Sequence, residues 1–200
     1  MSQTDFETAA RWVASLVAAL PAEAWKGPGL GDWDMRALVG HASRALLTVE
    51  QYLQTPAEQA ELHDPVAYFE AVSRMPNADP GAVLQRGVEA GVALGSAPAE
   101  AFAGTVERVV GGLAELADQD PILRTIAGSI HLSNYLPTRT FELVVHGLDI
   151  ARAAKMEAAP PREPLRSSIA IAAERAIQLD IGPDLILSLT GRATLATTVL

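Results

Sequence analysis

Five polar side chains share one face of a predicted helix in the second half of the chain. They are Tyr135, Arg139, Glu142, His146 and Asp149. The helix is predicted over 134–155, where Glu142 and His146 are four positions apart and therefore lie within roughly 40° of each other. Apolar residues flank this face on both sides, so it points into an interior or a cavity. Ionisable groups in such a place are costly unless they are paired or bind a metal.

The residues alone leave two interpretations of this face open. In the first, Arg139 pairs with Glu142 and His146 pairs with Asp149, and the network serves only structure. In the second, Glu142 and His146 bind a divalent metal through a carboxylate oxygen and an imidazole nitrogen. A Glu-x-x-x-His pair is common in helices and does not decide between them. Several ionisable groups on one face of a largely apolar helix favour the second.

A third candidate ligand, His41, lies on an earlier helix, predicted over 33–54. It is at the edge of the apolar face of that helix, roughly 90° from its centre. A lone histidine at such an edge is usually structural. Together with Glu142 and His146 it would form a site of two imidazoles and one carboxylate. This ligand set suits Zn²⁺ best, and also Fe²⁺, Ni²⁺ or Mn²⁺, and it leaves positions open for water or substrate.

Two charged residues on the later helix have expected roles next to this site. Arg139, one turn before Glu142, is expected to bind a substrate carboxylate, or alternatively to pair with Glu142 or Asp149. Asp149 is expected to orient His146 or a neighbouring group without being a metal ligand itself. As part of a surface ion pair, Asp149 would have no functional role.

The composition excludes other kinds of site. None of the 200 residues is cysteine, which rules out disulfides, thiolate metal sites, iron–sulfur clusters and a cysteine nucleophile in this chain. The net charge of −9 disfavours nucleic acid and anionic membranes as partners, because both are bound by basic clusters. Residues 1–7 lack the features of a signal peptide. No stretch approaches the roughly 20 apolar residues that span a bilayer. We therefore expect a soluble, cytoplasmic protein.

The elements that must position the three candidate ligands are predicted to be helices. Ala and Leu are abundant and aromatic residues make up only 5%, which favours helices over a β-sandwich. We expect Asp32 to cap the helix over 33–54 and Ser133 to cap the helix over 134–155. The pattern of residues 122–132 does not distinguish a helix from an extended segment. The apolar periodicity predicts helices over 5–20, 33–54, 65–74, 79–94, 98–118, 134–155, 165–179 and 183–189.

The expected fold class is therefore all-α, with a four-helix bundle and additional short helices. A chain of 200 residues is within the usual size range of one domain, so we expect residues 1–200 to form a single helical domain. A bundle is the usual way in which four amphipathic helices bury their apolar faces.

The motifs on the two ligand-bearing helices resemble a known family. Trp33-x-x-x-x-Leu38-x-x-His41 follows a Pro-Gly connector, and the later helix reads Tyr135-Leu136-x-x-Arg139-x-x-Glu142-x-x-x-His146-Gly147-x-Asp149. Together they are similar to the metal-binding N-terminal domain of mycothiol-dependent maleylpyruvate isomerases, in the DinB-like superfamily of four-helix bundles. The segment Leu189-Thr190-Gly191-Arg192 also resembles the end of that domain, so the similarity spans about residues 5–192.

This resemblance implies a DinB-like bundle whose metal is bound by His41, Glu142 and His146, with mycothiol as a co-substrate. The glutamate at position 142 favours the isomerase-like branch over DinB-like thiol transferases, which typically use three histidines. The expected partners are a small-molecule thiol and an electrophilic substrate. Analogy with the superfamily also suggests a homodimer. Three functions stay open: a metal-dependent isomerase or thiol S-transferase, a non-catalytic metal-binding or partner-binding bundle, and a purely structural site without metal.

Overall fold

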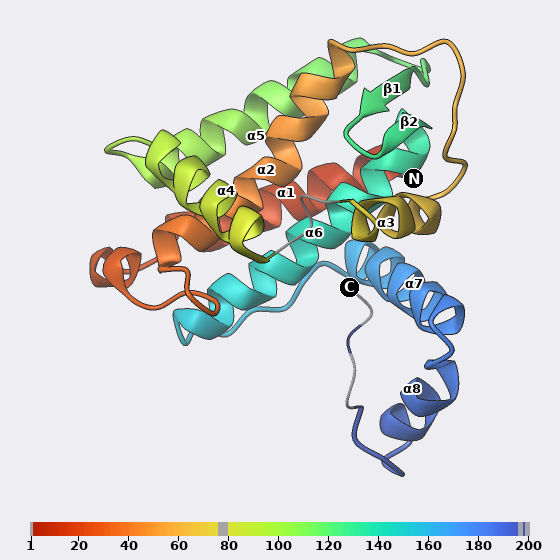
Figure 1. The fold of residues 1–200 in the computed structure, drawn as a ribbon. Coiled ribbons are helices and arrows are strands. Elements are labelled where there is room, and N and C mark those ends of the chain that lie inside the picture. Colours follow the sequence, from red (N-terminus) through yellow and green to blue (C-terminus); the bar gives the residue numbers. More distant parts are fainter. Residues whose placement is uncertain (1, 76–79, 196–197, 199–200) are drawn as a thin grey trace.

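The computed structural model describes residues 2–75, 80–195 and 198, and these residues are predominantly helical (Figure 1). The expected all-α fold class is thus confirmed. The start of the helix predicted over 79–94 and both ends of the predicted 1–200 domain lie outside the described residues. No helix within the described part of the chain has the length and apolar character needed to cross a bilayer. The helices are α1 (Ser2–Ala18), the 3-10 helix η1 (Ala22–Lys26), α2 (Met35–Leu53), α3 (Pro65–Ser73), α4 (Pro80–Ala93), α5 (Pro98–Glu115), α6 (Leu132–Ala153), α7 (Arg162–Gln178) and α8 (Gly182–Leu189).

Four of these helices, α1, α2, α5 and α6, form a closed ring in which each packs against two others. Their facing sides are apolar, and each contributes fully buried side chains such as Phe6, Leu38, Phe102 and Leu143. Around this four-helix bundle, α4 packs against α2, while α3 and α7 pack against α6. Helix α8 packs against α7 and projects away from the bundle (Figure 1). The bundle therefore places α2 and α6 side by side.

Helix α2 begins later than the sequence predicted, at Met35, and its cap is Asp34. Oδ1 of Asp34 accepts a hydrogen bond from the backbone N–H of Ala37 at 2.7 Å. The prediction that Asp32 caps this helix is therefore wrong. A carboxylate at the cap position satisfies a backbone donor that the first turn leaves free. Because the helix begins after Trp33, the indole of that residue can fold back against α2.

The prediction that Ser133 caps α6 is also wrong, because the helix begins at Leu132 and already includes Ser133. The N–H of Ser133 donates to Oδ1 of Asp120 at 2.7 Å, and its hydroxyl donates to Oδ2 at 2.8 Å. Asp120 thus satisfies a free donor of the first turn from the preceding loop. This carboxylate lies too far away in the sequence for a local capping rule to find it.

The ambiguous segment forms an antiparallel hairpin of β1 (Ile122–Thr125) and β2 (Gly128–His131). Leu123 faces Ile130 across the two strands, and both side chains are fully buried in the main core. The hairpin leads directly into α6 (Figure 1). It therefore anchors the start of the helix that carries two of the candidate ligands.

Candidate metal centre

His41 on α2 approaches Glu142 and His146 on α6 in the interior of the bundle. One imidazole nitrogen or carboxylate oxygen from each residue lies within 4.8 Å of those from the other two. The rings of His41 and His146 have centroids 4.7 Å apart and are nearly perpendicular, at 87°. The side chains of Glu142 and His146 are only 23% and 12% exposed. Three residues far apart in the sequence thus form one compact, sheltered group.

His41 has a buried ring nitrogen without a partner. Its Nδ1 makes no hydrogen bond within the described structure. The indole of Trp33 packs against the ring, with centroids 4.5 Å apart and an angle of 32° between the planes. Burial lowers the pKa of His41 to about 3, and the charge of His146 adds to this effect. His41 is therefore neutral at physiological pH, which is the protonation state that binds metals.

His146 lies between two carboxylates of its own helix. Its Nε2 is 3.2 Å from Oε2 of Glu142, and its Nδ1 is 3.2 Å from Oδ2 of Asp149. Burial alone would lower the pKa of His146, but the hydrogen bonds with Asp149 and Glu142 outweigh it and raise the pKa to about 9. For Glu142, burial is outweighed by the hydrogen bond with His146 and the charge of Arg139, so its pKa falls to about 2. Without a metal, His146 and Glu142 thus form an imidazolium–carboxylate pair.

This donor set fits a divalent metal ion. A metal and a proton are alternatives at Nε2 of His146, because both need the same lone pair. The contact of Asp149 with Nδ1 would hold the imidazole ring of His146 in place and make its Nε2 more basic. The partnerless nitrogen of His41 supplies a second imidazole, and Glu142 supplies the carboxylate. Two imidazoles and one carboxylate with open positions are typical of catalytic zinc sites.

Arg139 does not form either of the ion pairs considered from the sequence. The residue is 9% exposed, and its Nε donates to the hydroxyl of Thr138 at 3.0 Å. Its guanidinium carbon lies 4.9 Å from the ring centroid of Tyr135 and 5.3 Å from that of Tyr68. Within the described residues, the carboxylates of Glu142 and Asp149 pair with His146 instead. The Arg139–Glu142 pair of the structural interpretation is therefore absent from the described residues, whereas its second pair, His146–Asp149, is present.

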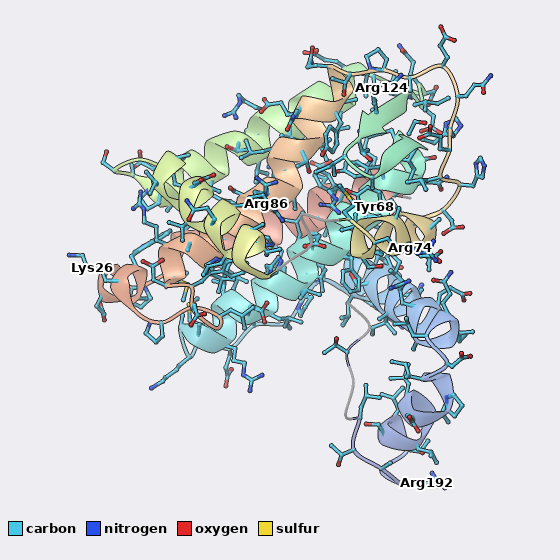
Figure 2. The ribbon with its side chains drawn as sticks, in the orientation of Figure 1. Lys26, Tyr68, Arg74, Arg86, Arg124 and Arg192 are labelled. Atoms are coloured by element: carbon cyan, nitrogen blue, oxygen red, sulfur yellow. The ribbon has the colours of Figure 1, made fainter. Side chains whose placement is uncertain are left out.

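Four residues near the site were not predicted to belong to it: Trp33, Arg44, Tyr68 and Arg86. Arg44 lies one turn after His41, so helical spacing could have pointed to it. Tyr68 of α3 and Arg86 of α4 (both labelled in Figure 2) come from other helices. The charge of Arg86 acts on both His41 and Arg44. Only the packing of α4 on α2 and of α3 on α6 reveals these neighbours.

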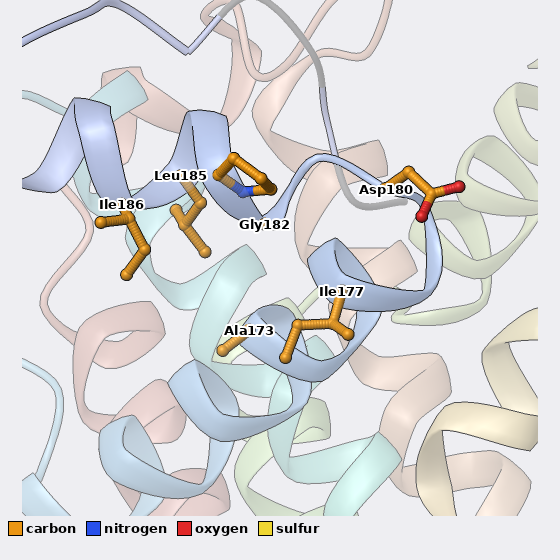
Figure 3. A pocket seen from close by; sticks show the side chains of 7 residues that line it. Ala173, Ile177, Asp180, Gly182, Leu185 and Ile186 are labelled. Atoms are coloured by element: carbon orange, nitrogen blue, oxygen red, sulfur yellow. The ribbon is translucent and has the colours of Figure 1, made fainter.

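A separate hollow of about 560 Å³ lies between α7 and α8 (Figure 3). Apolar side chains such as Ile177, Leu185 and Ile186 line it, and Asp180 is at its edge. Neither the three candidate ligands nor the arginines near them line it. The chemistry expected from the sequence therefore belongs to the α2–α6 site and not to this hollow.

We expect the metal-free protein to be most stable near pH 6.5, through opposite effects of His41 and His146, the two half-buried histidines of the site. His146 has its pKa raised from 6.5 to about 9, so its stabilisation is present below pH 6.5 and is lost as the pH rises towards 9. His41 has its pKa lowered from 6.5 to about 3, so stability is lost as the pH falls from 6.5, because the unfolded chain then binds the extra proton. Urea unfolding of metal-stripped protein between roughly pH 4 and pH 9 measures both effects.

The variant His146→Gln is the control for the alkaline side of this profile, since it cannot gain or lose the proton. The loss of stability above pH 6.5 should disappear in this variant while the loss on the acidic side remains. An unchanged alkaline loss in His146→Gln would show that His146 does not carry the charge assigned to it.

The fold and the site define a class of protein: a four-helix bundle with a sheltered His–Glu–His group and a carboxylate next to one of the histidines. The family model of the mycothiol maleylpyruvate isomerase N-terminal domain matches residues 6–151. The chain therefore belongs to this family. The match includes all three candidate ligands and ends within α6, so the similarity expected for Leu189–Arg192 stays a prediction. No curated protein and no solved structure matches the chain.

Proposed function

We propose that this protein binds one divalent metal through His41, Glu142 and His146 and uses it to activate a low-molecular-weight thiol for reaction with an electrophile. The observation that carries the proposal is the approach of three ligand-type atoms to within 4.8 Å of one another. Membership of the mycothiol maleylpyruvate isomerase family supports mycothiol as the thiol. A divalent metal lowers the pKa of a bound thiol, so that thiolate is available at neutral pH.

The residues of the chain supply what such a reaction needs apart from the sulfur. None of the 200 residues is cysteine, so a thiol nucleophile would have to come from a separate molecule. Asp149 holds Nδ1 of His146, and this leaves Nε2 directed at Glu142. Trp33 covers one face of His41 and limits the access of water to it. Arg139, one turn before Glu142, is proposed to bind the substrate. The ligand set favours Zn²⁺, with Fe²⁺, Ni²⁺ and Mn²⁺ as alternatives.

Elemental analysis and a thiol assay test the proposal in sequence. Protein purified without a metal-affinity tag should contain about one divalent metal ion per chain. Metal-loaded protein offered mycothiol and a panel of electrophiles should consume the thiol, and metal-stripped protein should not. Bound metal without thiol consumption by any electrophile would favour the alternative function, a non-catalytic metal-binding or partner-binding bundle. A wild-type protein that binds none of the four metals would refute the site itself.

A further inference from the structure

The α7–α8 arm (residues 162–192) presents an apolar surface that the bundle leaves uncovered. None of the residues of α8 is buried, and this helix projects away from the bundle (Figure 1). Of the twelve large apolar side chains that the described residues expose, half lie on this arm: Ile169, Ile177, Leu179, Ile186, Leu187 and Leu189. Single exposed apolar residues are ordinary, whereas a contiguous group of them marks an interaction site.

These side chains gather around the hollow between α7 and α8. On α7, Ala173 and Ile177 are four positions apart and share one helix face with Ile169. They lie across the hollow from Leu185 and Ile186 of α8 (Figure 3). Ile177 and Ile186 line the hollow and are nevertheless 61% and 62% exposed, so the hollow opens to solvent. Its volume of about 560 Å³ is in the range of pockets that enclose drug-sized apolar molecules, so several aliphatic side chains have room in it.

The charge of the arm differs from that of the rest of the chain. The arm contains four arginines and four acidic residues, so its formal charges cancel, and the net charge of −9 belongs to the other residues. Two copies of such a chain repel each other when their acidic parts meet. An approach through the two arms brings neutral, apolar surfaces together and keeps the acidic bundles apart, because α8 projects away from the bundle. Charge therefore favours the arm as the contact between two copies.

The arm also supplies both halves of a self-complementary contact. It has a projecting apolar helix, α8, and an open apolar hollow next to that helix. In a two-fold interface the same patch lies on both subunits, so α8 of one copy can enter the hollow of the other while its own hollow is filled in return. The exposed apolar side chains of the arm amount to several hundred Å² per copy. Two copies would bury on the order of 1,000 Å² in total, which is where specific interfaces begin.

We propose that the α7–α8 arm is a homodimer interface, in which α8 of each copy packs into the hollow between α7 and α8 of the other copy. The proposal is independent of the proposed function, because none of the three candidate metal ligands lies on the arm. Both helices also lie outside residues 6–151, so the match to the family assigns them no role. A membrane surface is the less favoured occupant, because the neutral arm lacks the basic cluster that anionic lipids attract.

Sedimentation equilibrium of the whole chain tests the interface. At roughly 100 µM, which populates a dimer with a micromolar dissociation constant, the wild type should have twice the 21.1 kDa mass of one chain. Ile186→Glu should raise the dissociation constant about a hundredfold or more, because a two-fold interface contains this residue twice and each buried carboxylate costs about tenfold. Val92→Glu is the matched control. It adds the same charge at a 68% exposed position on α4 and should leave the dimer intact.

A second variant, Ile177→Glu, changes the opposite wall of the hollow and should dissociate the dimer as well. Both positions are exposed in the single chain, so the helical circular dichroism and the zinc affinity of both variants should equal those of the wild type. If one variant loses helical structure, the other decides. Because α8 projects from the bundle, a dimer joined by the arms should also be elongated, and sedimentation velocity should give a higher frictional ratio than for a compact dimer.

Four results would refute this interface. They are a wild type that is monomeric at this concentration, a folded Ile186→Glu or Ile177→Glu variant that dimerises as tightly as the wild type, equal dissociation by Val92→Glu, and a compact dimer. Vesicles of phosphatidylcholine and phosphatidylserine test the other occupant. A monomeric wild type that binds these vesicles, and loses this binding in Ile186→Glu, would assign the arm to a membrane surface instead of a second copy.

Discussion

Replacing Gly40 with alanine should lower the free energy of unfolding by about 3 kcal/mol, at the upper end of what overpacking usually costs. Gly40 is buried on α2 at the point where α4 crosses closest. A Cβ atom there would overlap the backbone of Gly91 and come within 2.7 Å of the carbonyl carbon of Ala90. Backbone atoms cannot rotate away as a side chain can, so α2 and α4 would have to separate.

The site should respond as well, because Gly40 precedes His41. Separation of the helices would also disturb Trp33, whose indole N–H donates to the carbonyl of Leu84 on α4 at 3.0 Å while its ring packs on His41. We therefore expect Gly40→Ala to weaken zinc binding in addition to lowering the melting temperature by roughly 6–12 °C. Urea unfolding, thermal melting and zinc titration measure the three effects.

Gly104→Ala is the matched control for this substitution. Gly104 lies inside α5, and nothing is within 4 Å of the Cβ that alanine would add. Alanine should therefore stabilise α5 by up to about 1 kcal/mol through its higher helix propensity. If Gly40→Ala were as stable as Gly104→Ala, the close contact of α2 with α4 would be wrong, and so would the position of Trp33 over His41.

The candidate site could be predicted from the sequence because two of its three ligands lie on one helix. A spacing of four residues places Glu142 and His146 together in any α-helix, whatever the tertiary structure. The apolar residues on both sides of them indicated that this face turns inward. Helical spacing could not place His41, because its distance from Glu142 and His146 depends on how α2 packs on α6. The resemblance to the family indicated that His41 joins them.

The features that the sequence did not reveal depend on contacts between distant segments. Asp120 replaces the expected cap Ser133 because a loop carboxylate reaches the first turn of α6. One of the two interpretations of Arg139 pairs it with an acid on the same helix, but the structure brings the ring of Tyr68 from α3 against its guanidinium instead. Glycine is unfavourable inside a helix, but Gly91 of α4 is needed for close packing on α2: a Cβ on it would lie 2.7 Å from the carbonyl oxygen of Arg36.

Loss of any one of the three candidate ligands should reduce zinc affinity about a hundredfold or more. Structural zinc sites with four protein ligands have apparent binding free energies of about 10–16 kcal/mol, which corresponds to roughly 2.5–4 kcal/mol per ligand. The variants His41→Ala, Glu142→Gln and His146→Ala should therefore all bind zinc weakly. Competition with a chelator of known affinity measures each dissociation constant. The exposed His63 provides the control, because His63→Ala should bind zinc as the wild type does.

The ranking of the variants is more informative than any single value. Asp149→Asn should lose about 10–100-fold in zinc affinity, less than a ligand variant, because Asp149 contacts Nδ1 of His146 and acts only through that ring. Zinc should raise the melting temperature of the wild type and of His63→Ala, but hardly that of the ligand variants, since stabilisation follows affinity. Equal zinc affinity in His41→Ala and the wild type would exclude His41 as a ligand. The α2–α6 contact would then bring the three residues together without making them one site, because a real three-ligand site must depend on each of its ligands.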